Sequence, residues 1–366
     1  AEWYYGPQER LLASYRFLHT PTKGIYDELS VTTAWQDIAE SRHNRERDDD
    51  WLHNREEKVY VFSTNLDARK KVTGSSQISY GAEILWNQVN SSAFSENITT
   101  RETAALDTRY PDGGTVVNSS AAYFTHRWTI NPSLTLSDGI RFTNYQLRSE
   151  FVDTSFFPFP ESIIEQQNQA LSGNLGLVWQ TRNQVKVSGL LSSGFRAPNL
   201  DDIAKVFDSQ PGNVVVPNPD LLPETTYNAE VSIDKRVTDL FDSEITGWYT
   251  WYNNAIVVRD FTIDGQDSIV YDGVLSKVQA NVNAREAWLG GISHAIHFRW
   301  NSLELGHTIT WTYGQDVSGG VPLDHIPPLF GQATVSYPLG RWQYLGKVAY
   351  QVWKRLYRYS PCLLYT

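Results

Sequence analysis

Side chains that could bind a ligand are concentrated between His43 and Lys58, in the stretch HNRERDDDWLHNREEK. Imidazole and carboxylate groups bind transition metals, and arginine guanidinium groups bind anionic chelates. A mixed-charge loop in solvent would have the same composition, and we favour that simpler interpretation. The candidate ligand-binding residues of this stretch are His43, Arg47, Trp51 and His53.

A second region of interest is the connection from Phe195 to Thr225, which contains five prolines and several Asn and Asp residues. Proline fixes φ, and Asn or Asp side chains hold turns, so this composition predicts an ordered loop rather than a flexible linker. We expect Arg196 to pair with a lumen carboxylate, and we keep Arg196 and Asn218 as candidate ligand-binding residues. In the alternative, the prolines alone hold the loop and Arg196 lies in solvent. The apolar residues of the loop should be buried; they are Leu200, Ile203, Val206 and Phe207.

The remaining histidines and the single cysteine give weaker signals. His325 comes just before a Pro-Pro turn and is a further candidate ligand-binding residue. His294, His297 and His307 fall in strand-like stretches, where a histidine is an ordinary lumen or interface residue. Cys362 alone allows neither an internal disulfide nor a cysteine-based metal site. We therefore expect no metal site and no cofactor.

Sequence motifs of enzymes are absent. There is no Gly-rich phosphate loop, no G-x-S-x-G and no H-E-x-x-H. The formal net charge of −10 argues against a nucleic-acid partner, which would require a basic face. The sequence therefore predicts a protein that is not an enzyme and does not bind nucleic acid.

The elements that carry these residues show apolar and polar residues alternating with period two. Alternating stretches of about ten residues include 78–87, 303–311 and 342–352. Ten residues suffice for a tilted strand to cross a bilayer. In the first stretch Leu85 is the one apolar exception on the polar face, where Ser79, Glu83 and Asn87 should line the lumen. The residues predicted to face lipid are Ile78, Tyr80, Ala82, Ile84 and Trp86.

Short connections alternate with long ones along the chain. The short ones are Thr73–Ser75, Asn131–Ser133, Thr181–Asn183 and Pro338–Gly340. The long ones are His43–Glu57, Asn90–Ser120, Phe151–Asn168, Phe195–Thr225 and Gly314–Pro328. This order is typical of a transmembrane antiparallel up-and-down β-barrel. We count about fourteen strands, predict an all-β fold, and expect the tryptophans near strand ends to form interfacial girdles.

Two motifs in correct order carry a family resemblance. GFRAPN at Gly194–Asn199 and PNPDLLPET at Pro217–Thr225, followed by the strand YNAEVSI, resemble the signature region of TonB-dependent outer-membrane receptors. TRYPDGG at Thr108–Gly114 and IPPLFG at Ile326–Gly331 are similar to the branch of this family common in Bacteroidetes. The resemblance spans nearly all of residues 1–366 and implies a barrel domain that belongs to a barrel of about twenty-two strands. Such receptors also have a plug domain and a TonB-contacting box, which are not visible in this sequence.

The resemblance implies an outer-membrane receptor of a Gram-negative bacterium. Its activity would be active import of a scarce solute, most often a ferric siderophore or haem, with energy from the TonB complex through the plug. Its partners would be that complex, the iron chelate or haem, and outer-membrane lipid. No histidine lies between residues 199 and 217, so that loop offers haem no histidine ligand. Two alternatives are a passive porin-like channel and a soluble, aromatic-rich β protein that binds carbohydrate.

Overall fold

Antiparallel strands dominate the computed structural model, which describes residues 1–153, 155–156, 162–181, 183–204, 207–210, 212–271, 274–323 and 326–354. Fourteen of its twenty strands have ten residues or more. These long strands are β2 (Glu9–His19), β3 (Glu28–Arg45), β4 (Trp51–Lys71), β5 (Ser76–Asn97), β7 (Thr115–Asn131), β8 (Leu134–Glu150), β9 (Ile163–Gln180), β10 (Val185–Arg196), β13 (Glu224–Thr238), β14 (Phe241–Asp260), β16 (Val274–Trp300), β17 (Leu303–Asp316), β19 (Phe330–Leu339) and β20 (Trp342–Gln351).

The remaining elements lie in the connections at one end of the sheet. They are β1 (Glu2–Tyr5), β6 (Thr103–Ala105), the helix α1 (Leu200–Ile203), β11 (Phe207–Gln210), β12 (Asn213–Val216), β15 (Ser268–Tyr271) and β18 (Val321–Pro322). The sequence allows at most one helical turn at residues 205–210. The described positions 207–210 instead form the strand β11, and the helix α1 comes before them. Within the part of the chain that is described, no helix is long and apolar enough to cross a membrane.

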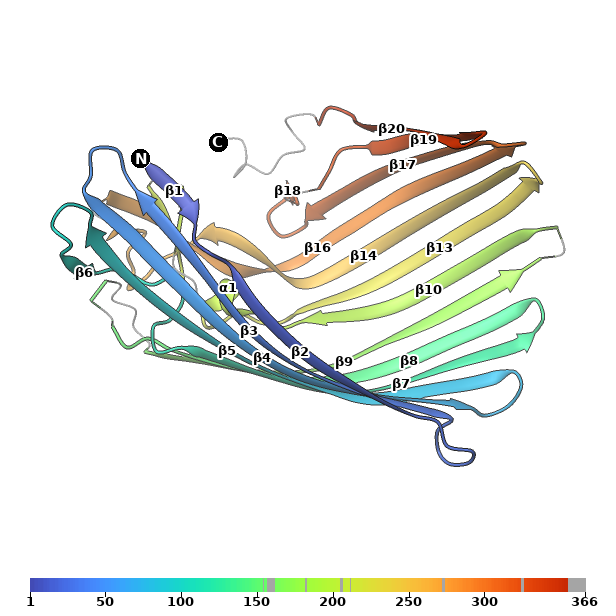
Figure 1. Ribbon diagram of the computed structural model, residues 1–366, viewed down its shortest axis with the longest axis horizontal. Coiled ribbons are helices and arrows are strands. Elements are labelled where there is room, and N and C mark those ends of the chain that lie inside the picture. Colours follow the sequence, from blue (N-terminus) through green and yellow to red (C-terminus); the bar gives the residue numbers. More distant parts are fainter. Residues whose placement is uncertain are drawn as a thin grey trace.

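The long strands follow one another in chain order and pair antiparallel with their neighbours, as an up-and-down barrel requires. Their number agrees with the predicted count of about fourteen. Across the described residues, β1 and β2 both pair with β3, while β20 pairs only with β19. The sheet is therefore a curved, open trough with the N-terminal and C-terminal strands at its two edges (Figure 1). A barrel of about twenty-two strands stays a prediction.

The strands are longer than predicted, and they extend well past the length that crosses a bilayer. β4 and β5 pair without interruption from Trp51↔Asn97 to Lys71↔Gln77, and β16 has 27 residues. The expectation of a long loop at His43–Glu57 is therefore wrong. β3 continues to Arg45 and β4 begins at Trp51, with Asp48 in the left-handed conformation (φ 64°) that aspartate tolerates in tight turns. The expectation failed because the polar ends of these two paired strands have the same residue composition as a loop.

The two faces of the sheet differ as the alternation predicts. Trp35, Phe62 and Trp86 lie directly opposite one another on adjacent strands, and the rings of Trp35 and Trp86 stack with centroids 6.3 Å apart. Ala82 and Ile84 are exposed on this same apolar face. On the opposite face Glu83 pairs with Arg141, Nη2 to Oε1 3.0 Å. The division of β5 into an apolar and a polar face is confirmed.

Buried apolar side chains gather at one end of the trough. Ile203 and Ala204 at α1 pack with Leu221 against three residues of the sheet, Val117, Leu147 and Ile164. A second cluster joins β12 to β16, which pair in parallel. Because these packed segments lie on the polar face of the sheet, inside the trough in Figure 1, that face is the lumen side. The described segments within residues 197–223 form a lobe at the mouth of the barrel.

Candidate functional site

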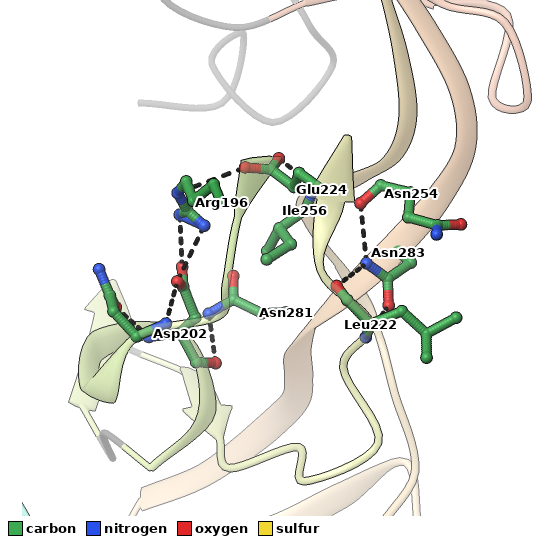
Figure 2. Close-up of polar contacts among 9 residues, drawn as sticks. Arg196, Asp202, Leu222, Glu224, Asn254, Ile256, Asn281 and Asn283 are labelled. Atoms are coloured by element: carbon green, nitrogen blue, oxygen red, sulfur yellow. Dashed lines mark hydrogen bonds and ion pairs between the residues drawn. The ribbon is translucent and has the colours of Figure 1, made fainter. Parts of the chain in front are cut away.

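Arg196, the last residue of β10, joins the lobe to the barrel wall. Its guanidinium group makes two parallel contacts with the Asp202 carboxylate, Nη1–Oδ2 3.0 Å and Nη2–Oδ1 2.9 Å. Its Nε lies 3.3 Å from Oε2 of Glu224, the first residue of β13 (Figure 2). A planar fork that binds a carboxylate through two bonds fixes orientation as well as distance. The predicted carboxylate partner of Arg196 is confirmed, although it comes from the lobe itself.

The helix α1 has four residues and begins with a capping box. The Asn199 side chain accepts from the Asp202 backbone N–H at 3.0 Å, and the Asp202 carboxylate accepts from the Asn199 N–H at 2.8 Å. Burial raises the pKa of Asp202, against the opposing effects of the Asn199 N–H and Arg196. Asp202 thus has two tasks, since it caps the helix and holds Arg196.

Asn218 and two asparagines of β16 complete this bracing. The Asn218 amide donates to the carbonyl of Asn281 at 2.7 Å, and the Asn281 amide donates to the carbonyl of Asp202 at 2.9 Å. Asn283 accepts from the Leu222 N–H at 2.8 Å and donates to the Leu222 carbonyl at 2.9 Å. Figure 2 shows the contacts of Asn281 with Asp202 and of Asn283 with Leu222. Neither of these two β16 asparagines was predicted as a site residue, although their spacing of two places them on one face of a strand.

The structure gives the two histidines of the β3–β4 hairpin different surroundings. His43 Nδ1 lies 2.7 Å from Oδ1 of Asn54, its Nε2 lies 3.0 Å from the Ser41 hydroxyl, and its ring stacks on Tyr4. Both ring nitrogens are therefore engaged. His53 lies opposite Asn44, not opposite His43, so adjacent register positions put the two imidazoles on opposite faces.

The other candidates of the hairpin are also not brought together. Trp51 shares the lumen face of β4 with His53, whereas Arg47 lies in the turn with 87% of its side chain exposed, 3.9 Å from Asp48. His325 lies outside the described residues. Over the described ranges, no three His, Cys, Asp or Glu residues are placed to hold a metal ion. A role of His43, Arg47, Trp51, His53, Arg196, Asn218 or His325 in ligand binding stays a prediction.

Glu57 is a buried carboxylate near the mouth, and no sequence pattern singles it out. Its side chain is 3% exposed, and neither carboxylate oxygen has a hydrogen-bond partner within the described chain. On β4, Glu57 precedes Tyr60 by three residues and is nearer to the mouth. The Tyr60 ring lies 5.9 Å from that of Trp35, a residue of the predicted aromatic girdle, so Glu57 lies above the membrane. Burial raises the pKa of Glu57 although Arg109, Arg42 and Arg55 oppose this.

Ser91 of β5 lies directly opposite Glu57 and is likewise buried without a hydrogen-bond partner for its hydroxyl in the described part of the chain. Ser91 lines a cavity of about 330 Å³ between β5 and the loops above it. Three aspartates also line this cavity, as do aromatic and small apolar side chains. Buried polar groups normally have partners, so this pair marks a place where a further polar group fits.

Comparisons with known proteins agree with this architecture. The family model for the TonB dependent receptor-like β-barrel matches residues 2–361. The hemoglobin and hemoglobin-haptoglobin-binding protein A of Haemophilus influenzae is 27% identical over 183 residues, which is 46% of this chain and 16% of that protein. The iron-regulated outer membrane virulence protein of Vibrio cholerae is 24% identical over 168 residues, 44% of this chain and 25% of that protein.

Solved structures show the same fold at low sequence identity. The copper transporter OprC has a TM-score of 0.76 at 12% identity and covers 93% of this chain and 51% of its own. The Serratia marcescens hemophore receptor HasR has a TM-score of 0.71 at 12% identity, with 95% and 59% covered. The chain thus spans about half the length of the structures it matches. A family model that matches almost every residue is decisive: the chain belongs to the TonB-dependent receptor β-barrel family of the Gram-negative outer membrane.

Proposed function

We propose that this chain is the barrel portion of an outer-membrane receptor that actively imports a ferric siderophore or haem, with energy supplied by the TonB complex through a plug domain. Capture at the mouth would precede a rearrangement of the plug and passage along the polar lumen. No covalent chemistry is required. The predicted absence of enzyme activity fits a family of transport receptors.

The observation that carries the proposal is a mouth with a formed shape above a polar lumen, in a chain of this family. The lobe is braced to the wall by Arg196 and by the β16 asparagines, so it presents a fixed surface to a ligand. Preorganised surfaces bind with a smaller entropic cost than flexible loops. A passive porin would need no such lobe, and the proposal therefore favours selective capture.

The relatives support iron as the imported element. One is named for hemoglobin binding and another for iron regulation, and structural neighbours include siderophore receptors as well as a copper transporter. In haem capture, His53 on the lumen face is better placed as an axial ligand than His43, whose ring nitrogens are both engaged. Replacing each by alanine and measuring the haem Soret band would separate these two positions.

Uptake of labelled iron tests the proposal directly. Cells that carry or lack the gene are supplied with the metal as haem or as a ferric siderophore, in backgrounds with and without TonB. We expect uptake of one of these compounds to require both the gene and TonB. Unchanged uptake in the deletion strain, or gene-dependent uptake that does not need TonB, would contradict active import and favour the porin alternative.

A further inference from the structure

The cavity beside Ser91 is lined by acidic and by apolar side chains. Asp107, Asp112 and Asp153 line it, together with Tyr271. No Lys or Arg lines the cavity among the described residues. The apolar residues that line it are Ala93, Ala105, Leu106, Phe151 and Phe156. A volume of about 330 Å³ is at the lower end of the range for small-molecule sites.

The aspartates are held in place by bonds that leave acceptor capacity. Asp112 accepts from the backbone N–H groups of Val152 (2.8 Å) and Asp153 (2.9 Å). Asp153 accepts from the N–H and hydroxyl of Ser155, which hold the pKa of this carboxyl below its usual range. Asp107 is neutralised by Arg55 at 2.7 Å. Since each carboxylate can accept about four hydrogen bonds, Asp112 and Asp153 offer negative charge and free lone pairs.

The floor of the cavity supplies an independent sign of a ligand. Ser91 is 6% exposed, and its hydroxyl has no partner in the part of the chain described, although it lines the cavity. Glu57, directly opposite it, is 3% exposed and also without a hydrogen bond. Leaving such groups without a hydrogen bond is energetically costly, and a bound donor group would recover part of this cost.

We propose that this cavity binds a cationic ammonium or guanidinium group attached to an apolar or aromatic body. The cation would lie between Asp112 and Asp153, and the body would rest on Phe151 and Phe156. Aromatic faces and carboxylates both attract cations, and the cavity offers both. The inference rests on the proposed receptor function because it assigns this chemistry to part of the captured ligand. Arginine-mediated capture of an anionic chelate would need a different location.

Three probes of similar shape and different charge test the proposal: benzylamine, benzyl alcohol and benzoate. Their binding to the full-length protein in detergent is measured by saturation-transfer NMR titration at low and at high salt. We expect benzylamine to bind at least tenfold more tightly than benzoate, with benzyl alcohol between them. Higher salt should weaken benzylamine binding, because part of its attraction is electrostatic.

Two variants locate the site. Asp153→Asn preserves the shape and should weaken benzylamine binding roughly threefold to tenfold, as expected for a partly exposed charge contact. Asp239→Asn removes the same charge from the turn between β13 and β14, at the other end of the barrel, and should change nothing. Ala93→Phe fills the cavity and should abolish binding of all three probes. Heat-modifiable migration on gels confirms that each variant is folded.

The proposal is overturned if benzoate binds as tightly as benzylamine, or if Asp153→Asn and Asp239→Asn behave alike. It is also overturned if folded Ala93→Phe binds benzylamine normally. None of these outcomes depends on transport. If the probes fail to bind as expected but iron uptake still depends on TonB, the cationic subsite is wrong and the proposed function stands. If the probes bind as expected but iron uptake does not depend on the gene and TonB, the proposed function is wrong and the subsite stands.

Discussion

Two polar regions at the mouth of the barrel differ in whether their buried groups have partners. Around the lobe, the Asp202 carboxylate is met by Arg196 and by the Asn199 N–H, and Asn281 is bonded on both its amide and its carbonyl. At the cavity, Ser91 and the Glu57 carboxylate opposite it are more deeply buried but have no hydrogen bond within the described chain.

The difference separates scaffold from binding surface. A fully bonded network is rigid and holds one conformation, whereas unmatched buried groups persist where another interaction is made. Arg196 and Asn218 stand in the family motifs, yet their contacts brace the lobe. The cavity lies outside GFRAPN and PNPDLLPET, although Thr108 and Asp112 belong to TRYPDGG, and its polar groups are the ones available to a ligand.

The largest expected effect is that of Arg196→Ala, which removes both bonds to a buried carboxylate. We expect it to destabilise the lobe by about 1–3 kcal/mol, because Asp202 is left uncompensated. Cleavage between residues 197 and 223 by added protease should accelerate roughly fivefold to 150-fold, since cleavage follows the population of the open lobe. Arg236→Ala, which breaks a pair with Asp242 at the opposite end of the barrel, is the matched control. Equal resistance of both variants would mean that Arg196 does not brace the lobe.

A smaller effect is expected for Asn283→Ala. This change removes bonds to both backbone groups of Leu222 and to the carbonyl of Asn254 (2.8 Å). The cost should be about 1 kcal/mol, since Leu222 is half exposed and water can replace part of the bonding. Hydrogen exchange at the Leu222 amide should accelerate about fivefold, while Gln343→Ala near the opposite rim leaves it unchanged. No change at Leu222 would show that the prolines alone hold this segment.

The smallest expected effect is that of Glu57→Gln on thermal stability. Burial raises the folded pKa of Glu57 above its unfolded value, so the stability linked to its proton is present at low pH and lost as the pH rises through the folded pKa. Glutamine has no such loss. We expect this variant to have a higher melting temperature than the wild type at pH 8, with a gain in the free energy of unfolding on the order of 1 kcal/mol. The gain should vanish toward pH 4.

The groups that face Glu57 make this a sharp comparison. Glu40 and Arg42 come from β3, Arg55 from β4 and Arg109 from the loop above, and the arginines favour the ionised form. If these attractions outweigh burial, Glu57→Gln will instead melt lower at pH 8. That result would place Glu57 among the satisfied, structural groups and end the contrast between the two regions.

The sequence predicted the barrel because period-two alternation and turn chemistry are local signals, as in residues 78–87 of β5. It also predicted a carboxylate partner for Arg196, because a planar guanidinium group at the start of an ordered loop can bind a carboxylate through two bonds. It could not predict that His43–Arg45 and Trp51–Glu57 are paired strands, because polar strands above a membrane resemble loops in composition. Nor could it predict the cavity, whose residues come from segments more than fifty positions apart, such as Ser91 and Phe151.

Hydrogen exchange along the mouth of the full-length protein, with and without benzylamine, tests the contrast between scaffold and binding surface most directly. Without the probe, residues 213–224 should exchange slowly, since β12 pairs with β16 and the lobe is bonded to the wall. Residues 105–112 should exchange faster, and benzylamine should slow them while leaving 213–224 unchanged. Fast exchange at 213–224, or protection by benzylamine only at that segment, would contradict the assignment of the two regions.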